Sequence, residues 1–164
     1  MKKRILKAIS GATLVIVAMA GFTQAWVTAQ VQREPGLIGS WDVQVTARDC
    51  ETGTQIPFIP VFPAILTYNQ GGTMDETDLG GPGIVRLPGH GVWQHQIGRQ
   101  YSAAYRWLNF LPDRTFIGSN VVRSSVNVSL SGDSYTSTDT LEILNPNGDV
   151  VATGCATTVA TRFQ

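Results

Sequence analysis

The chain has 164 residues with equal numbers of basic and acidic side chains, and 43% of its residues are hydrophobic. Four of the cations, Lys2, Lys3, Arg4 and Lys7, lie near the start of the chain, and without them residues 30–164 carry a net charge of −4. This acidic remainder argues against nucleic-acid binding, which requires a basic patch or stripe. Its 135 residues suit one domain with one core.

Residues 1–29 are predicted to be a secretory signal peptide. The cationic start precedes the apolar run AISGATLVIVAMAGF, and small residues allow cleavage after Ala29 or after Ala25. The alternative is an uncleaved membrane anchor, but the run is shorter than the ~20 residues that a spanning helix needs. We therefore expect a periplasmic or secreted protein with no stable membrane span after cleavage.

The two cysteines, Cys50 and Cys155, both lie in the exported part of the chain. Disulfides persist in oxidising compartments, so a Cys50–Cys155 bridge is expected. Two unpaired buried thiols are the alternative.

From residue 37 onward, hydrophobic residues alternate with polar ones and turn residues recur at short intervals, which predicts an all-β domain over residues 30–164. The expected strands, in chain order, are 38–49, 61–70, 72–78, 90–97, 99–110, 114–130, 133–144 and 148–163. Most of the connections between them are short and have hairpin composition, so strands that follow one another in sequence should pair. The longer links 50–60 and 79–89 are rich in proline or glycine, and the second is a candidate lid.

Eight consecutive antiparallel strands predict either an up-and-down barrel or a β-sandwich. A barrel removes both exposed sheet edges, and the two ends of the domain favour it. If the first and last strands pair antiparallel, a single register brings Trp41 to Arg162 and nearly aligns Cys50 with Cys155.

The Gly-x-Trp of the first strand (Gly39, Ser40, Trp41) and the arginine of the last strand (Arg162) resemble the calycins, which include the lipocalins and fatty-acid-binding proteins. The resemblance implies a closed barrel in which Arg162 packs over Trp41 and seals one end. The length and the long loops are also similar to barrels of the allene oxide cyclase and spirotetronate cyclase type, which close rings. A lipocalin Thr-Asp-Tyr sequence near mid-chain and a helix between the last two strands are not present.

The alternation predicts which residues face the interior. In the strand 114–130, the even positions from Phe116 to Leu130 should face the core. The strand 99–110 places Tyr101, Tyr105 and Trp107 on one face, and we expect these three, with Trp93 and Glu76, to bind a ligand. An apolar barrel would raise the pKa of Glu76, as suits a general acid or base. The alternative is that Glu76 pairs with an arginine such as Arg106.

His90 lies between Gly89 and Gly91, directly after the glycine-rich and proline-rich link, and is placed at the barrel mouth. It is a candidate for orienting a substrate, although a bend at the entry to a strand explains the glycines without any chemistry. His90 and His95 should point to opposite faces of one strand, so a shared metal ion is not expected.

The sequence is compatible with three functions. The first is an exported barrel that binds a small, mainly apolar molecule in its interior. The second is a cyclase or isomerase that uses Glu76 and His90 in the same cavity, and the third is a structural or interaction module with a filled interior. No cofactor or metal motif is found, and the sequence does not indicate an oligomeric state.

Overall fold

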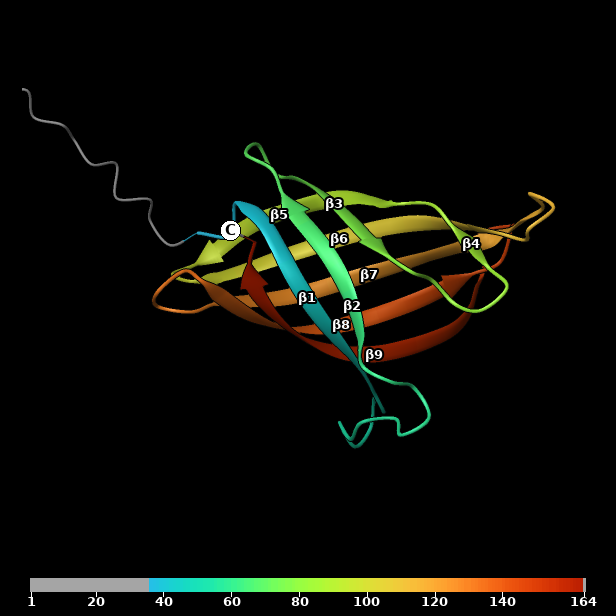
Figure 1. The fold of residues 1–164 in the computed structure, drawn as a ribbon, viewed down its shortest axis with the longest axis horizontal. Helices are drawn as coiled ribbons and strands as arrows, with labels where there is room; N and C mark the ends of the chain where they lie inside the picture. The colour runs from blue at the N-terminus through green and yellow to red at the C-terminus, as the bar shows by residue number, and fades with distance from the viewer. Residues whose placement is uncertain (1–35, 164) are drawn as a thin grey trace, which may run out of the picture. The chain divides into compact units, whose positions relative to one another are not determined.

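A computed structural model describes residues 36–163, which form antiparallel β-structure (Figure 1). The strands of this region are β1 (Gly39–Arg48), β2 (Phe62–Tyr68), β3 (Thr73–Asp78), β4 (Val85–Arg86), β5 (Gly89–Ile97), β6 (Gln100–Phe110), β7 (Phe116–Val128), β8 (Ser134–Leu144) and β9 (Val150–Arg162). Each of the eight predicted strands is present, and β4 is an addition within the link 79–89. The predicted signal peptide lies outside the described residues.

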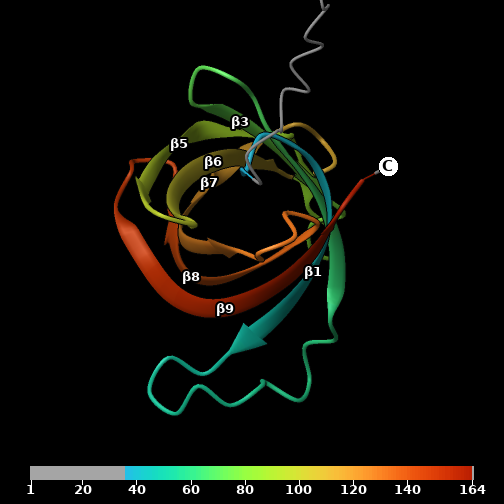
Figure 2. The same cartoon turned by 90° about the vertical axis from the view of Figure 1, so that its left-hand side faces the viewer.

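The sheet closes on itself because β1 pairs with both β2 and β9. Around the barrel the order is β1-β9-β8-β7-β6-β5-β3-β2, so the predicted up-and-down barrel is confirmed and the sandwich is not observed. Figure 2 shows the ring of strands from one end. In the β1–β9 pairing Trp41 lies opposite Arg162, which is the register expected from the sequence.

The short strand β4 is an offset beginning of β5. It pairs with β6 through Val85 with Phe110 and Arg86 with Asn109, whereas β5 pairs His90 with Arg106. From Arg86 to His90 the chain advances four residues while β6 advances only three, so one extra residue is accommodated between the strands. Such a bulge changes which face a side chain occupies. It places Arg86 on the same face as Asn109, towards the barrel interior.

One end of the barrel is sealed by Trp41, and we call it the closed end. The Trp41 side chain is fully buried and its indole N–H donates to the Leu37 carbonyl at 2.9 Å. The Arg162 guanidinium lies 4.2 Å from the centre of the indole ring and donates to the carbonyls of Gly36 and Ile38. Gly39 has φ +130°, and a Cβ there would lie 2.6 Å from Arg162 Nη1, so a side chain at this position would displace the arginine.

The opposite end carries the connections 49–61, 79–88, 111–115 and 145–149, and we call it the open end. The predicted disulfide between Cys50 and Cys155 is present near it, with the two Cα atoms 5.2 Å apart. This bond ties the long β1–β2 connection to β9.

The prediction that the even positions of β7 face the interior is correct in the middle of the strand and wrong at its ends. Val122, Ser124, Val126 and Val128 are buried towards the interior as expected. Leu130 is instead 81% exposed beyond the strand. At the other end the β6–β7 register shifts near Gly118, so that Phe116 pairs with Phe110 and the alternation is broken.

No helix within residues 36–163 is long and apolar enough to cross a membrane.

Candidate functional site

The inward side chains are buried more completely at the closed end of the barrel than towards the open end. Large side chains at the closed end, among them Trp41, Tyr68 and Tyr135, are almost completely inaccessible. Towards the open end the inward positions of β1 and β9 hold small residues, Ala47, Gly154 and Ala156, and these are only partly buried. Tyr105 and Trp107 on the inner face of β6 are also partly buried. Small side chains on one wall and aromatic rings on another therefore line the less deeply buried part of the interior.

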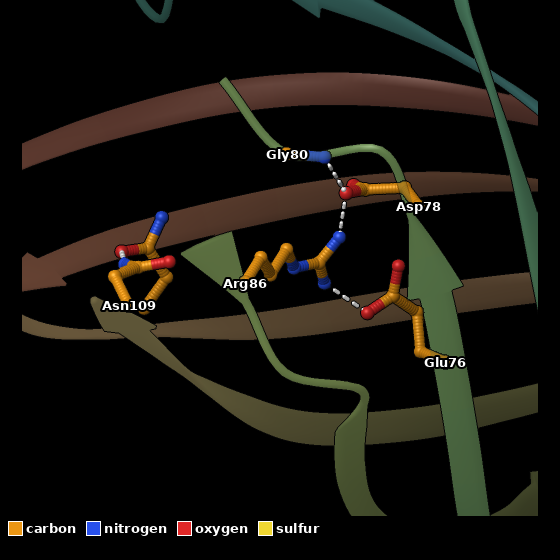
Figure 3. A network of polar contacts seen from close by, with 6 residues as sticks. Glu76, Asp78, Gly80, Arg86 and Asn109 are labelled. Carbon is orange, nitrogen blue, oxygen red and sulfur yellow. Dashed lines mark hydrogen bonds and ion pairs between the residues drawn. The ribbon is translucent and has the colours of Figure 1, made fainter. Parts of the chain in front are cut away.

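A buried cluster of charges lies inside the wall next to Trp107. Glu76 and Asp78 occupy alternate inward positions of β3, and the Arg86 side chain, 3% exposed, forms ion pairs with both (Figure 3). The Arg86 guanidinium also lies over the Trp107 ring, 3.8 Å from its centre. The backbone N–H of Gly80 donates to Asp78 Oδ1 at 2.7 Å. These contacts join β3, β4 and β6 and fasten the link 79–88 to the barrel.

The ion pair explains how Glu76 can be only 2% exposed. Burial raises the pKa of Glu76, and the Arg86 guanidinium offsets part of that rise. An isolated buried carboxylate would be very costly, so each partner makes burial of the other tolerable. The alternative that Glu76 pairs with an arginine is thus observed, but the partner is Arg86. Arg106 is exposed and lies opposite His90 in the β5–β6 register.

A third inward carboxyl group, Asp139, lies inside the barrel without a cation. It is 8% exposed on the inner face of β8, and the Ser137 hydroxyl donates to its two oxygens at 2.9 and 3.1 Å. Ser137 in turn contacts the Thr158 hydroxyl. Within residues 36–163 no arginine or histidine forms an ion pair with Asp139. Burial raises the pKa of Asp139, and hydrogen bonds from Ser124 and Ser137 oppose the rise.

The phenol of Tyr105 lies within electrostatic reach of two interior carboxyl groups, Glu76 and Asp139. Burial raises the pKa of Tyr105 well above its usual value, and the charges of Glu76 and Asp139 raise it further. Burial also raises the pKa values of Tyr68 and Tyr135. All three phenols are therefore neutral hydrogen-bond donors near pH 7.

The predicted ligand-binding residues fall into two groups. Glu76, Tyr105 and Trp107 come together inside the barrel, where Tyr105 and Trp107 stack with their ring centres 6.0 Å apart. Trp93 and Tyr101 lie nearer the closed end, with ring centres 5.8 Å apart, and the Trp93 indole N–H donates to the carbonyl of Asn69 in the β2–β3 turn. Trp93 and Tyr101 thus pack against the closed end rather than against the charged cluster.

The expected position of His90 at the barrel mouth is not observed. Its imidazole lies on the outer wall, 75% exposed, with Nδ1 2.8 Å from Asp75 Oδ1. The flanking glycines face inward, and they serve close packing rather than a bend. A Cβ on Gly89 would lie 2.7 Å from Glu76 Oε2, and one on Gly91 would lie 2.6 Å from the Tyr105 Cα atom. Gly89 therefore leaves room for the Glu76 side chain, and Gly91 allows the backbone of β6 to approach closely.

Arg86, Asp78 and Asp139 are not among the predicted site residues. Arg86 lies in a link with the composition of a loop, so the sequence assigns it no face, whereas Asp78 ends the predicted strand 72–78 on the same face as Glu76. Asp139 was detectable, because Tyr135, Ser137 and Asp139 alternate along β8 and share the face of the buried Tyr135. No group of three or more His, Cys, Asp or Glu side chains that could hold a metal ion occurs in residues 36–163.

A shallow hollow of about 610 Å³ lies on the outer wall of strands β5 to β8. Outward-facing small residues such as Ala104, Ser125 and Thr140 line it. The sheet separates it from Asp139, which faces inward.

Comparison with known proteins found no match to a family model, to a curated protein or to a solved structure. The closed barrel is established by its strand pairing, and the similarity to the calycins remains a resemblance in the terminal strands.

Proposed function

We propose that this is an exported barrel protein that binds a small, mainly apolar molecule in its interior, entering through the open end. The observation that carries the proposal is the contrast between the two ends. Inward side chains are almost inaccessible at the closed end, whereas small inward residues such as Ala47 and Ala156 remain partly exposed towards the open end. Eight-stranded barrels hold one small ligand when side chains do not fill them.

Export is supported by two separate features. The cationic and apolar start of the chain has the composition of a signal peptide. The Cys50–Cys155 disulfide suits an oxidising compartment. We propose a periplasmic or secreted location on this basis.

Binding is preferred over catalysis by Glu76 because of the state of that carboxyl group. Its carboxylate is engaged by Arg86, and both side chains are almost completely buried. Proton transfer by Glu76 would first have to disrupt this buried ion pair, which is costly. No such cost applies to the binding of an apolar molecule beside Tyr105 and Trp107.

The proposal is tested with diphenylhexatriene, a neutral apolar probe whose fluorescence increases when it leaves water. The wild type should bind it, and Ala156→Trp should weaken binding by about tenfold or more, because the indole fills the interior; tenfold corresponds to about 1.4 kcal/mol. Val159→Trp on the same strand is the matched control, since Val159 faces outward and is 59% exposed. Ala47→Leu is a second filling variant in case Ala156→Trp does not fold. Absence of binding to the folded wild type, or equal binding by both tryptophan variants, would refute the proposal.

A further inference from the structure

The interior carries more negative than positive charge. Inside the barrel, Glu76, Asp78 and Asp139 carry the acidic side chains and Arg86 carries a guanidinium. Arg86 is already engaged by Glu76 and Asp78. Asp139 is therefore the interior carboxyl group with unused capacity to accept a positive charge.

Small residues surround Asp139 on the neighbouring strands. In the strand register Asp139 lies between Ser124 of β7 and Ala156 of β9. The next strands place Ala103 beside Ser124 and Ala47 beside Ala156. One row of the inner wall thus reads Ala47, Ala156, Asp139, Ser124, Ala103, Trp93, and the two residues directly beside Asp139 in this row are small.

The hydrogen bonds around Asp139 leave acceptor capacity unused. A carboxylate has about four lone-pair sites, and the donors at this position are the hydroxyls of Ser137 and Ser124. Both hydroxyls orient the carboxylate and neither neutralises it. Tyr105 nearby offers a neutral aromatic ring, and aromatic faces attract cations more strongly when water is excluded.

We propose that the interior site is selective for small organic amines, with the ammonium group bound by the Asp139 carboxylate and the apolar body lying towards Tyr105 and Trp107. The inference rests on the proposed function and specifies the chemistry of its ligand. An anion is disfavoured because three carboxyl groups face one arginine in this interior. A neutral apolar molecule gains only the burial of its surface, whereas an amine adds a charge-assisted hydrogen bond.

The test compares two ligands of similar shape, phenethylamine and phenethyl alcohol, by isothermal titration calorimetry at neutral pH. The wild type should bind the amine about tenfold more tightly than the alcohol, a preference of about 1.4 kcal/mol. Asp139→Asn keeps the size of the side chain and should abolish the preference while leaving alcohol binding within about twofold. Asp42→Asn is the matched control, because Asp42 is exposed on the outer face of β1, and it should retain the preference.

The outcomes separate the two proposals. If the wild type binds amine and alcohol equally, the amine site is refuted and interior binding stands. The same conclusion follows if only diphenylhexatriene binds, or if Asp139→Asn keeps the preference. If none of the three probes binds, the proposed function fails as well. A cooperative unfolding transition for Asp139→Asn establishes that the comparison is between folded proteins.

Discussion

Replacement of Arg86 by methionine tests whether the buried charge cluster holds the link 79–88 in place. Methionine retains much of the volume over Trp107 but removes the cation, so Glu76 is left 2% exposed without its partner. Breaking a buried ion pair by removing one partner costs about 3–5 kcal/mol, mainly because the other charge stays buried. The substitution also removes the contact between the guanidinium and the Trp107 ring. We expect the free energy of unfolding of Arg86→Met to fall by about 3–5 kcal/mol at pH 7.

The assay is urea denaturation followed by intrinsic fluorescence, with Arg106→Met as the matched control. Arg106 is exposed on the outer face of the same sheet, and its replacement should change stability by no more than about 0.5 kcal/mol. Adding Glu76→Gln to Arg86→Met should recover at least about 1 kcal/mol, because the buried group is then neutral. In Arg86→Met the pKa of Glu76 rises further than in the wild type, so the loss of stability should diminish as the pH falls and Glu76 takes up a proton.

The explanation would be wrong if Arg86→Met were within about 1 kcal/mol of the wild type, or if Glu76→Gln gave no recovery. Either result would mean that the cluster is hydrated in solution and does not fasten the link.

Three further changes test other parts of the structure. Replacing Cys50 and Cys155 together by serine should lower the free energy of unfolding by about 4–5 kcal/mol, because the bond closes a loop with a sequence separation of 105. Denaturation of the wild type with and without reductant measures the same contribution. Equal stability of the oxidised and the reduced protein would contradict the prediction. Gly91→Ala should abolish folding or broaden the unfolding transition, because its Cβ would lie 2.1 Å from the Ala104 carbonyl oxygen. A thermal unfolding transition as sharp as that of the wild type would show that β5 and β6 pack differently at this position. The raised pKa of Asp139 adds stability that is fully present below the unfolded pKa of about 3.9 and is lost as the pH rises through the folded pKa. Asp139→Asn should therefore be more stable than the wild type at pH 7 and lose that advantage towards pH 4, and urea denaturation showing a constant difference would refute the assigned environment.

The barrel was predictable because the sequence patterns that determine it are either local or lie in the first and last strands. Period-two alternation and short turns define the strands, and the pairing of Trp41 with Arg162 indicates closure. The disulfide followed from the presence of two cysteines in the part of the chain expected to be exported. These signals do not depend on the exact facing of any single residue.

The charged cluster was not predictable in the same way. Arg86 faces the interior because one extra residue is accommodated between β4 and β5, and a single-residue shift reverses the face of a side chain. Gly89 and Gly91 resembled a bend, but their role depends on Glu76 and Tyr105 packing against them from other strands. Asp139 could have been predicted, because it alternates with Tyr135 and Ser137 along β8. If Tyr135 faces the interior, Asp139 faces it too.

Native mass spectrometry of the protein purified from its own host most directly tests the claim that the interior binds a small molecule. The wild type and the outward control Val159→Trp should both carry a bound molecule, or take one up from a mixture of phenethylamine and diphenylhexatriene. Ala156→Trp should appear mainly at the mass of the chain alone, because its indole occupies the interior. A wild type that stays at the mass of the chain alone under all these conditions, or an adduct that persists in Ala156→Trp, would contradict the claim.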